Sequence, residues 1–337
     1  MTQIIKIKIL FLIMLIVNTL AFADDKVDDS SWELYHMKIF FENDIFAQTD
    51  NQYTSGEKIN LTYHVENPTA PIYDLLISSG SASDIFTSFS FANQIYTPED
   101  LLTSKLILDD RPYAGWTYLE AGIHKSTKDS LNTILLKVGM VGPSSQSENI
   151  QKQIHELSGS DEPMGWNNQL KDELGVNLTY AYKWRFTHET EGGFQSSYIP
   201  YIEADLGNIS TGAAVGIFAR FGWNIAKDFG ISTLDNNGES GIPIYDEQKI
   251  SIKRDWSFSF NFILTGSVVV RDIFLDGNTF KDSHSISKNP LVGYAGAGIS
   301  TRYKSFVFDF MQTVNTNKFD KEGKRDAVGT VLVTWLF

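Results

Sequence analysis

The feature that most constrains the fold of this chain is a repeated alternation of apolar and polar residues. In the segment 256–270, apolar side chains are separated by small polar ones: Phe258, Phe260, Phe262 and Leu264 against Ser257, Ser259 and Asn261. A period of two places successive side chains on opposite faces of a strand. Each such segment therefore predicts a β-strand with one apolar face.

Similar segments follow one another along most of the chain. Two of them flank the polar stretch 43–54, and the others span 85–95, 116–125, 131–141, 176–187, 197–206, 213–223, 256–270, 291–303, 305–316 and 327–337. They give about twelve strands, an even number as in bacterial outer-membrane barrels. We therefore predict an all-β protein, an antiparallel transmembrane β-barrel with a short helix in an extracellular loop.

The main rival is a soluble β-sandwich or barrel, which also alternates. Three observations favour the membrane barrel. The segments reach the roughly 9–11 residues that a tilted transmembrane strand needs. Aromatic residues make up 13% of the chain, as expected for interfacial girdles, and the last strand ends in Trp335-Leu336-Phe337. The chain also lacks a second, inward set of apolar residues that could fill a soluble core.

The beginning of the chain predicts export. Lys6 and Lys8 precede an apolar run over residues 9–17, and Ala21-Phe22-Ala23 has the small-residue pattern of a signal-peptidase site. We expect residues 1–23 to be a signal peptide and residues 24–337 to form one barrel domain. Without the two lysines, 26 basic residues face 41 acidic ones, a net charge of -15, so nucleic acid is a poor partner.

The strand order also predicts which connections face the outside of the cell. If the amino end of the barrel is periplasmic, the extracellular connections lie near residues 47–52, 98–112, 143–175, 207–212, 272–290 and 317–326. The connections 67–83 and 224–255 then lie on the periplasmic side, where they are longer than usual for this class of protein.

Three polar residues gather at the junction of the first two strands. Asn43 and Asp44 end the first strand, and Thr54 begins the second. Oxygen donors of this kind suit a hard cation such as Ca²⁺. The same residue types are also common in solvated turns, so a simple turn is the alternative.

The connection 143–175 contains the one clear helical pattern. Ser145-x-x-Glu148 predicts a capping box at its start, and Gly159 is well placed to end it. The apolar positions at helical spacing are Ile150, Ile154 and Leu157.

On such a helix, Gln151 and His155 are four residues apart and share a face. That face lies beside the apolar stripe, so the pair could look into a cleft at the barrel wall. Asp161 is a carboxylate that could fold back towards the same cleft. The alternative is a solvated histidine and a loop acid.

Arg111 lies in the polar stretch Asp109-Asp110-Arg111-Pro112. A planar guanidinium is well suited to hold a phosphate, which would make Arg111 a substrate-binding residue. An ion pair with Asp109 or Asp110 that orders the loop is the alternative.

Several motifs together resemble one family. In chain order they are Glu42-Asn43-Asp44-Ile45-Phe46, Tyr53-Thr54-Ser55-Gly56, Asp110-Arg111-Pro112-Tyr113-Ala114-Gly115-Trp116, Val141-Gly142-Pro143, Gln151-x-x-x-His155 and Gly165-Trp166-x-x-Gln169-Leu170. This series resembles the lipid A 3′-O-deacylase (LpxR-type) family of outer-membrane barrels. The resemblance implies twelve strands and Ca²⁺-dependent removal of the 3′-acyloxyacyl chain of lipid A.

The resemblance also implies an active site. Asn43, Thr54, Gln151 and His155 would be catalytic, Asp44 and Asn43 would hold the metal, and Asp161 would be a weaker match for a further metal ligand. Lipid A, or lipopolysaccharide, in the outer leaflet of the bacterial outer membrane would be the substrate. We expect a monomer with its active site towards the extracellular side.

The chemistry of this reading does not need a nucleophilic side chain. The chain has no cysteine and no G-x-S-x-G motif, so a histidine acting as general base on water is the simplest route. Bound Ca²⁺ would then stabilise the oxyanion. The alternatives are an outer-membrane phospholipase A, for which Ser126 near His124 is the nearest pair, and a porin or adhesin without enzymatic activity.

Overall fold

The structure is a computed structural model that describes residues 31–44, 52–77, 83–231, 233–234, 256–320, 322 and 327–337. Its strands are β1 (Ser31–Asn43), β2 (Gln52–Glu66), β3 (Asp84–Thr97), β4 (Ala114–Ser126), β5 (Ser130–Val141), β6 (Glu173–Trp184), β7 (Phe186–Glu189), β8 (Phe194–Gly207), β9 (Ser210–Trp223), β10 (Trp256–Asp272), β11 (Leu291–Tyr303), β12 (Phe306–Asn315) and β13 (Ala327–Leu336). The helical segments are η2 (Pro71–Leu75), η3 (Pro143–Ser145), α2 (Ser147–Ser158), η4 (Trp166–Asn168) and α3 (Ile273–Asp276).

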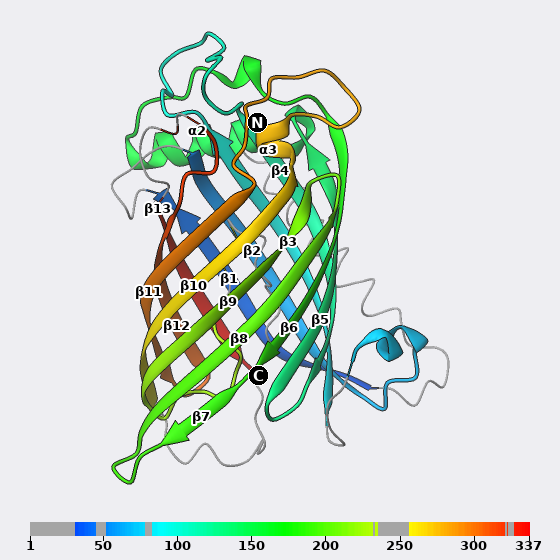
Figure 1. Cartoon of the computed structure of the whole chain (residues 1–337), viewed down its shortest axis with the longest axis vertical. Coiled ribbons are helices and arrows are strands. Elements are labelled where there is room, and N and C mark those ends of the chain that lie inside the picture. Colours follow the sequence, from blue (N-terminus) through cyan, green and yellow to red (C-terminus); the bar gives the residue numbers. More distant parts are fainter. Residues whose placement is uncertain are drawn as a thin grey trace.

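The strands close into a barrel (Figure 1). Every pairing is antiparallel, and β1 pairs with β13 from His36–Leu336 to Asn43–Gly329, which leaves no open edge there. On the far side β6 pairs with β8. The short β7 pairs only with the beginning of β8, so β6 and β7 form one interrupted strand, and the ring over the described residues has twelve strands. The predicted fold class is confirmed.

The interruption between β6 and β7 corrects the prediction of one strand over 176–187. Arg185 lies between the two segments, and its backbone N–H donates to the carbonyl of Asp129 at 2.8 Å. Its guanidinium is buried over the ring of Phe229, 4.9 Å from the ring centroid. The two parts keep one register against β8, with Lys183 opposite Tyr201 and Phe186 opposite Tyr198, so the predicted strand is interrupted at Arg185 alone.

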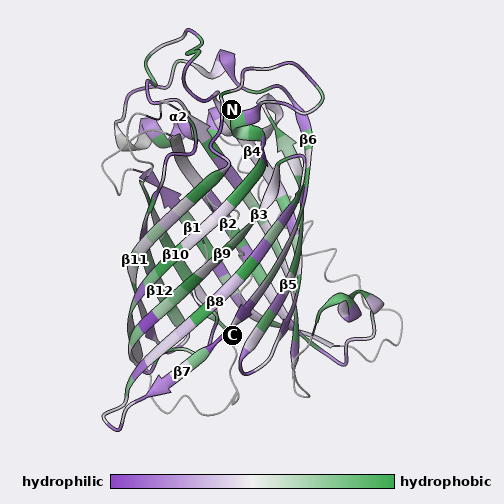
Figure 2. Ribbon diagram, in the orientation of Figure 1, coloured by the Kyte–Doolittle hydropathy of each residue, from purple (hydrophilic) through white to green (hydrophobic). Residues whose placement is uncertain are grey.

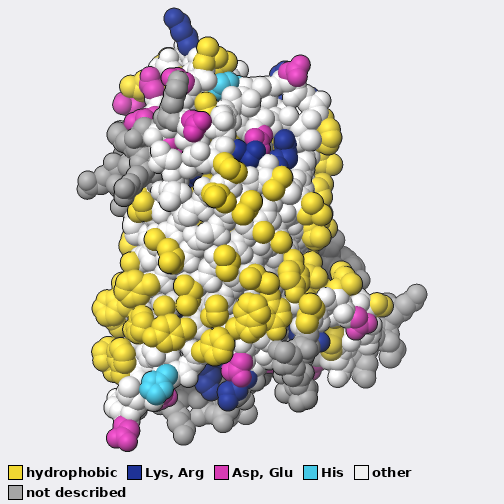
Figure 3. Space-filling view, viewed as in Figure 1, with side chains coloured by type: hydrophobic (Ala, Val, Ile, Leu, Met, Phe, Trp, Pro, Cys, Tyr) yellow, Lys and Arg dark blue, Asp and Glu magenta, His cyan; other side chains and the backbone are white. Residues whose placement is uncertain are grey.

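The two faces of the wall have opposite polarity. Apolar side chains on the outer face are exposed, among them Ile39 of β1, Ile59 of β2, Phe91 of β3 and Leu119 of β4. Figure 2 shows the alternation along the strands, and Figure 3 shows hydrophobic side chains spread over the visible barrel wall. This arrangement is what a lipid-facing surface requires.

The lumen contains buried polar and charged groups. Lys58 Nζ donates to Glu120 Oε2 at 2.9 Å, and both side chains are inaccessible to solvent. Ser90 Oγ donates to the other oxygen of the same carboxylate at 3.0 Å. The lumen also holds buried apolar residues such as Phe40 and Trp116, so the predicted lack of an inward apolar set is wrong. The exposed apolar outer face is what excludes the soluble alternative.

Part of the long connection after β9 enters the lumen. Phe229, Ile231 and Leu234 are buried in the main apolar cluster inside the barrel. The backbone N–H of Leu234 donates to Glu42 Oε1 at 2.7 Å, and its carbonyl accepts from Gln94 Nε2 at 2.9 Å. The described part of the predicted connection 224–255 therefore fills the barrel and contacts its wall.

The other long periplasmic connection, predicted at 67–83, contains η2. Tyr73 packs with Val65, Ile85 and Ile123, and its hydroxyl lies 2.9 Å from Thr87 Oγ1. These residues share the outer face of β2, β3 and β4. The connection therefore folds back on the outside of the wall.

The strand directions place the connections after β1, β3, β5, β8, β10 and β12 at one end of the barrel. Figure 1 shows α2 and α3 at this end, and the C-terminus at the other. The end that carries α2 is the predicted extracellular end. The predicted signal peptide, residues 1–23, lies outside the described residues. Among the residues that the structure describes, no helix has the length and apolar content to cross a membrane.

Candidate active site

The helix α2 packs against the outer face of the barrel wall. Asn93 of β3 and Thr117 of β4 are register partners, and each lies two positions from an exposed, lipid-facing residue of its own strand. Asn93 Nδ2 donates to Ser147 Oγ at 2.7 Å, and Thr117 Oγ1 donates to the carbonyl of Ser145 at 2.7 Å. These bonds hold the beginning of α2 on the outside of β3 and β4.

The close seating of the helix depends on a glycine. A Cβ atom at Gly115 of β4 would lie 2.1 Å from both Cβ and Oγ of Ser147, closer than real side chains approach. Glycine is therefore required at this position of the motif, because any side chain would push α2 off the wall.

The start of α2 differs from the prediction. The helix begins at Ser147, with Gln146 at its N-cap in the left-handed conformation (φ 63°) and no side-chain cap. Ser145 instead belongs to η3, and its hydroxyl accepts from the backbone N–H of Ser147 at 3.3 Å. The predicted capping box is wrong because the tight turn after Pro143 comes first. The predicted end at Gly159 is confirmed by a left-handed C-cap whose N–H donates to the carbonyl of His155.

The buried face of α2 is its polar face. Ser147, Gln151 and His155 follow at intervals of four residues and are 1%, 1% and 5% exposed. The half-buried Ile150 packs beside them against the cluster of Ile95, Leu101, Tyr113 and Trp166. A polar face turned towards a protein wall is unusual for a surface helix, and it indicates a site rather than a packing surface.

The exposed face of α2 carries ordinary surface charges. Lys152 Nζ lies 3.1 Å from Glu148 Oε1 and 3.2 Å from Glu162 Oε1. The hydrogen bond to Glu148 raises the pKa of Lys152. These groups are partly or largely exposed to solvent, in contrast to the buried face.

His155 is held in one orientation. Its Nδ1 lies 2.5 Å from the backbone carbonyl of Asp161. A carbonyl oxygen only accepts hydrogen bonds, so Nδ1 carries the proton in the neutral ring and Nε2 carries the lone pair. The structure thus brings Asp161 to His155 as predicted, but through its backbone, while the Asp161 residue as a whole is exposed.

Gln151 is fixed by a neighbouring aromatic residue. Trp166 Nε1 donates to Gln151 Oε1 at 2.7 Å, which identifies the amide oxygen and turns the amide nitrogen away from the indole. Gln151 Nε2 is buried and has no hydrogen-bond partner among the described residues. The amide therefore offers a donor inside the covered region.

The predicted oxygen donors Asn43, Asp44 and Thr54 lie at the end of the barrel that carries α2. Asn43 ends β1 opposite Ser55, Asp44 follows it, and both are buried. Thr54 is the extra residue of a β-bulge between β2 and β3, and its hydroxyl lies 2.6 Å from that of Thr97. Their burial excludes the alternative of a solvated turn for these three residues.

Three polar residues of the outer wall were not predicted as site residues from the sequence. Ser55 and Glu57 share the outer face of β2, and Asn93 faces Glu57 across the strand pair. Buried oxygens without hydrogen-bond partners among the described residues are Ser55 Oγ, Glu57 Oε1, Glu57 Oε2 and Asn93 Oδ1. The signal was present, since positions 55 and 57 interrupt an outward face that is apolar from 59 to 65.

Arg111 lies inside the barrel, apart from the residues between α2 and the outer wall. Its guanidinium is buried over the ring of Tyr96, 4.8 Å from the centroid, and it lines a cavity of about 140 Å³ inside the barrel with Asp272 and Lys318. Its guanidinium nitrogens have no hydrogen-bond partner among the described residues, so the alternative of a side-chain hydrogen bond to Asp109 or Asp110 is not realised. Substrate binding by Arg111 stays a prediction.

The pair considered for a phospholipase does not form a catalytic arrangement. His124 lies inside the barrel with Nε2 2.9 Å from Ser88 Oγ and Nδ1 2.9 Å from Thr133 Oγ1. Ser126 Oγ is buried and has no hydrogen-bond partner among the described residues. His124 therefore does not activate Ser126.

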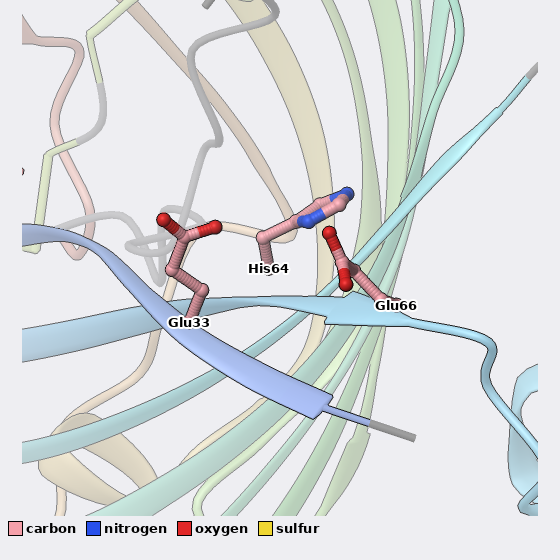
Figure 4. Close-up of side chains that lie close together, drawn as sticks. All are labelled: Glu33, His64 and Glu66. Atoms are coloured by element: carbon pink, nitrogen blue, oxygen red, sulfur yellow. The ribbon is translucent and has the colours of Figure 1, made fainter. Parts of the chain in front are cut away.

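A second group of possible metal ligands lies at the opposite end of the barrel. Glu33, His64 and Glu66 bring ligand atoms within 4.8 Å of one another. Figure 4 shows the three side chains close together. His64 Nε2 also lies 3.4 Å from Asp84 Oδ1. Both glutamates are exposed and far along the strands from α2, so this group is separate from the site described above.

Comparison with known proteins identifies the family. The family described as "Outer membrane protein LpxR" matches residues 9–337. The solved structure of LpxR from Salmonella typhimurium has a TM-score of 0.71 at 16% identity, covering 90% of this chain and 100% of that chain. The β domain of the Bordetella autotransporter BrkA gives a TM-score of 0.41 at 8% identity, covering 92% and 100%. No curated protein sequence matches the chain.

The closed barrel and its covered wall define the class: an outer-membrane β-barrel with the polar face of a helix buried against its outer face. Within this class, the chain belongs to the outer membrane protein LpxR family, as the match over nearly its whole length shows. The protein is accordingly located in the outer membrane.

Proposed function

We propose that the protein is a Ca²⁺-dependent esterase that hydrolyses the 3′-O-linked acyloxyacyl chain of lipid A. One observation carries the proposal: Gln151 and His155 lie on a helix face that is buried against the outside of a lipid-facing wall. A lipid in the outer leaflet can approach such a site along the barrel surface without entering the lumen.

The surroundings of the cleft fit a lipid substrate. One row below Glu57 and Asn93, the outer face becomes apolar, with Ile59, Phe91 and Leu119 all exposed. Acyl chains would contact this apolar row, while the polar headgroup would lie at the level of α2. The ester that joins the two parts would then lie at the boundary, where the polar residues begin.

In the proposed mechanism His155 activates a water molecule. Its Nδ1–H is fixed on the carbonyl of Asp161, so Nε2 is the atom that accepts the proton of water as the oxygen attacks the ester carbonyl. The imidazolium then returns that proton to the leaving alkoxide, which becomes the sugar 3-hydroxyl. Gln151 Nε2 would orient the water or the ester oxygen.

The residues at the strand ends fit a hard divalent cation. Asp44 and Asn43 would hold Ca²⁺, with Asp161 as a further ligand, and Thr54 would position the cation or the substrate. The buried, acceptor-rich wall beside them has the oxygen chemistry that Ca²⁺ prefers. Bound Ca²⁺ would polarise the ester carbonyl and stabilise the negative charge of the tetrahedral intermediate.

The non-enzymatic alternative is a channel, and the lumen argues against it. The segment that ends at Leu234 is bonded to Glu42 and Gln94 inside the barrel, and Lys58 and Glu120 form an ion pair within it. An adhesin would have no need for a buried histidine with a fixed tautomer.

The test is hydrolysis of lipid A by the purified protein in detergent. We expect release of the 3′-linked acyloxyacyl chain with Ca²⁺, loss of that release in excess chelator, and recovery when Ca²⁺ is restored. Full activity in excess chelator would remove the cation from the mechanism. Release of acyl chains from glycerophospholipids instead would favour the phospholipase alternative.

A further inference from the structure

Glu57 is a buried carboxylate on the outer wall for which the proposed mechanism has no role. It lies between Phe41 of β1 and Asn93 of β3 in the register of the sheet. Both carboxylate oxygens are shielded from solvent, and neither has a hydrogen-bond partner among the described residues. A buried, unpartnered carboxylate is strongly unfavourable, so it needs either a proton or a cation.

Among the described neighbours of Glu57, the Ser55 hydroxyl is the one donor in reach, and one hydroxyl cannot satisfy both carboxylate oxygens. Asn93 donates through Nδ2 to Thr117 Oγ1 at 2.6 Å and to Ser147 Oγ at 2.7 Å, so its remaining polar atom is the acceptor Oδ1. That oxygen is itself buried without a partner among the described residues, as is Ser55 Oγ. Directly opposite residues on one face of a sheet have Cβ atoms about 4.5–5.5 Å apart, so these side chains reach one another.

One cation would satisfy all these oxygens, whereas a proton on Glu57 would satisfy only one contact. The group also adjoins the predicted metal ligands, because Asn43 is the register partner of Ser55 and Asp44 is the next residue. Glu57 would add its negative charge to that of Asp44, and a site with several carboxylates suits a divalent cation.

We propose that Glu57 is an additional carboxylate ligand of the catalytic cation and that Ser55 and Asn93 contribute neutral oxygens to it. This inference rests on the proposed function for the presence of the cation. It also links the cation to the helix, since Asn93 would contact the ion through Oδ1 and Ser147 of α2 through Nδ2. Cation binding would then help to seat the helix that carries Gln151 and His155.

The experiment measures Ca²⁺ binding by isothermal titration of the purified full-length protein in detergent. Because ligand charge largely sets Ca²⁺ affinity, Glu57→Gln should weaken binding by at least about tenfold. Glu57→Asp, which keeps the charge, should fall between the parent and Glu57→Gln. Glu191→Gln is the matched control, because it removes an exposed carboxylate in the turn between β7 and β8, at the other end of the barrel.

Hydrolysis supplies the second readout. The Ca²⁺ concentration for half-maximal activity of Glu57→Gln should rise by the same factor as the dissociation constant, and most of the activity should return at saturating Ca²⁺. A lesion in folding would not be rescued in this way, and heat-modifiable migration checks that each variant is a folded barrel.

Two results would overturn the inference, and they are distinguishable. If the parent binds Ca²⁺ and Glu57→Gln binds it equally well, Glu57 is a protonated structural acid and the proposed function is unaffected. If the parent itself binds no Ca²⁺, the cation fails in the proposed function and the role of Glu57 fails with it.

Discussion

Two buried carboxylates on opposite faces of the barrel wall differ in their hydrogen-bond partners. Glu120 points into the lumen, where Lys58 and Ser90 each hold one of its oxygens. Glu57 precedes Lys58 in β2 and points outward, and its oxygens have no hydrogen-bond partner among the described residues. The same residue type is thus fully satisfied on one face and unsatisfied on the other.

We infer that the polar groups of the lumen serve stability and that those beside α2 serve function. A buried ion pair that is complete within the protein maintains the lumen and needs nothing from outside. A buried region with more acceptors than donors is complete only when something else binds, and this is expected of a site built for a cation and a substrate. Changes to the cleft should therefore reduce activity in a folded barrel, whereas changes to the lumen should reduce stability.

The largest effect is expected for Asp44→Ala in the cleft. Loss of this carboxylate removes the main proposed ligand of the cation, so hydrolysis should be undetectable at any practical Ca²⁺ concentration. The measurement is the Ca²⁺ titration of lipid A hydrolysis in detergent. Activity that returns at high Ca²⁺ would show that Asp44 is a peripheral ligand.

The next largest effect is expected for His155→Ala. Its rate of hydrolysis should fall by roughly 10²–10⁴-fold, which is typical for removal of a general base. His155→Asn should be equally poor, because an amide keeps a polar shape but does not accept a proton at neutral pH. Rates are compared at saturating Ca²⁺. A near-parental rate for His155→Ala would reduce this residue to a helix-packing role.

Lys58→Met tests the contribution of the lumen ion pair to stability. It leaves Glu120 as an uncompensated buried charge, and breaking a buried pair in this way costs about 3–5 kcal/mol of stability. The free energy of unfolding in denaturant should fall, while the folded fraction keeps its activity. The double variant Lys58→Met with Glu120→Leu should recover much of the stability. An unchanged free energy of unfolding for Lys58→Met would contradict the role given to the lumen pair.

Gln151→Ala should have the smallest effect. Orientation through one hydrogen bond contributes about 0.5–1.5 kcal/mol, or roughly two- to tenfold in rate. The loss should appear in the rate at saturating substrate and Ca²⁺, with the cation affinity retained. A loss as large as that of His155→Ala would mean that Gln151 takes part in the proton transfer.

Much of the fold could be predicted because a lipid-facing wall imposes a strict alternation. The strand ends at Tyr303 and Trp223 match the sequence pattern, since each position there is either in lipid or in the lumen. The break at Arg185 could not be read in this way, because alternation does not show that its N–H bonds to the carbonyl of Asp129 in the turn before β5. The same holds for Leu234, whose place in the lumen is set by partners nearly two hundred residues away.

The site was less accessible to sequence reasoning. Gln151 and His155 share a helix face by spacing alone, but only the bonds from Asn93 and Thr117 show that this face is turned towards the wall. Glu57 looked like one polar residue in a strand. Its meaning depends on Asn93, which lies across the strand pair and whose amide is fixed by the distant Ser147.

The central claim is that the cleft between α2 and the outer wall hydrolyses lipid A. Its most direct test is mass spectrometry of lipid A from cells that make the parent protein or His155→Ala at equal levels in the outer membrane. The parent should yield lipid A that lacks the 3′-acyloxyacyl chain, and the variant should leave lipid A intact. Intact lipid A with the parent, or equal loss of the chain with both proteins, would contradict the claim.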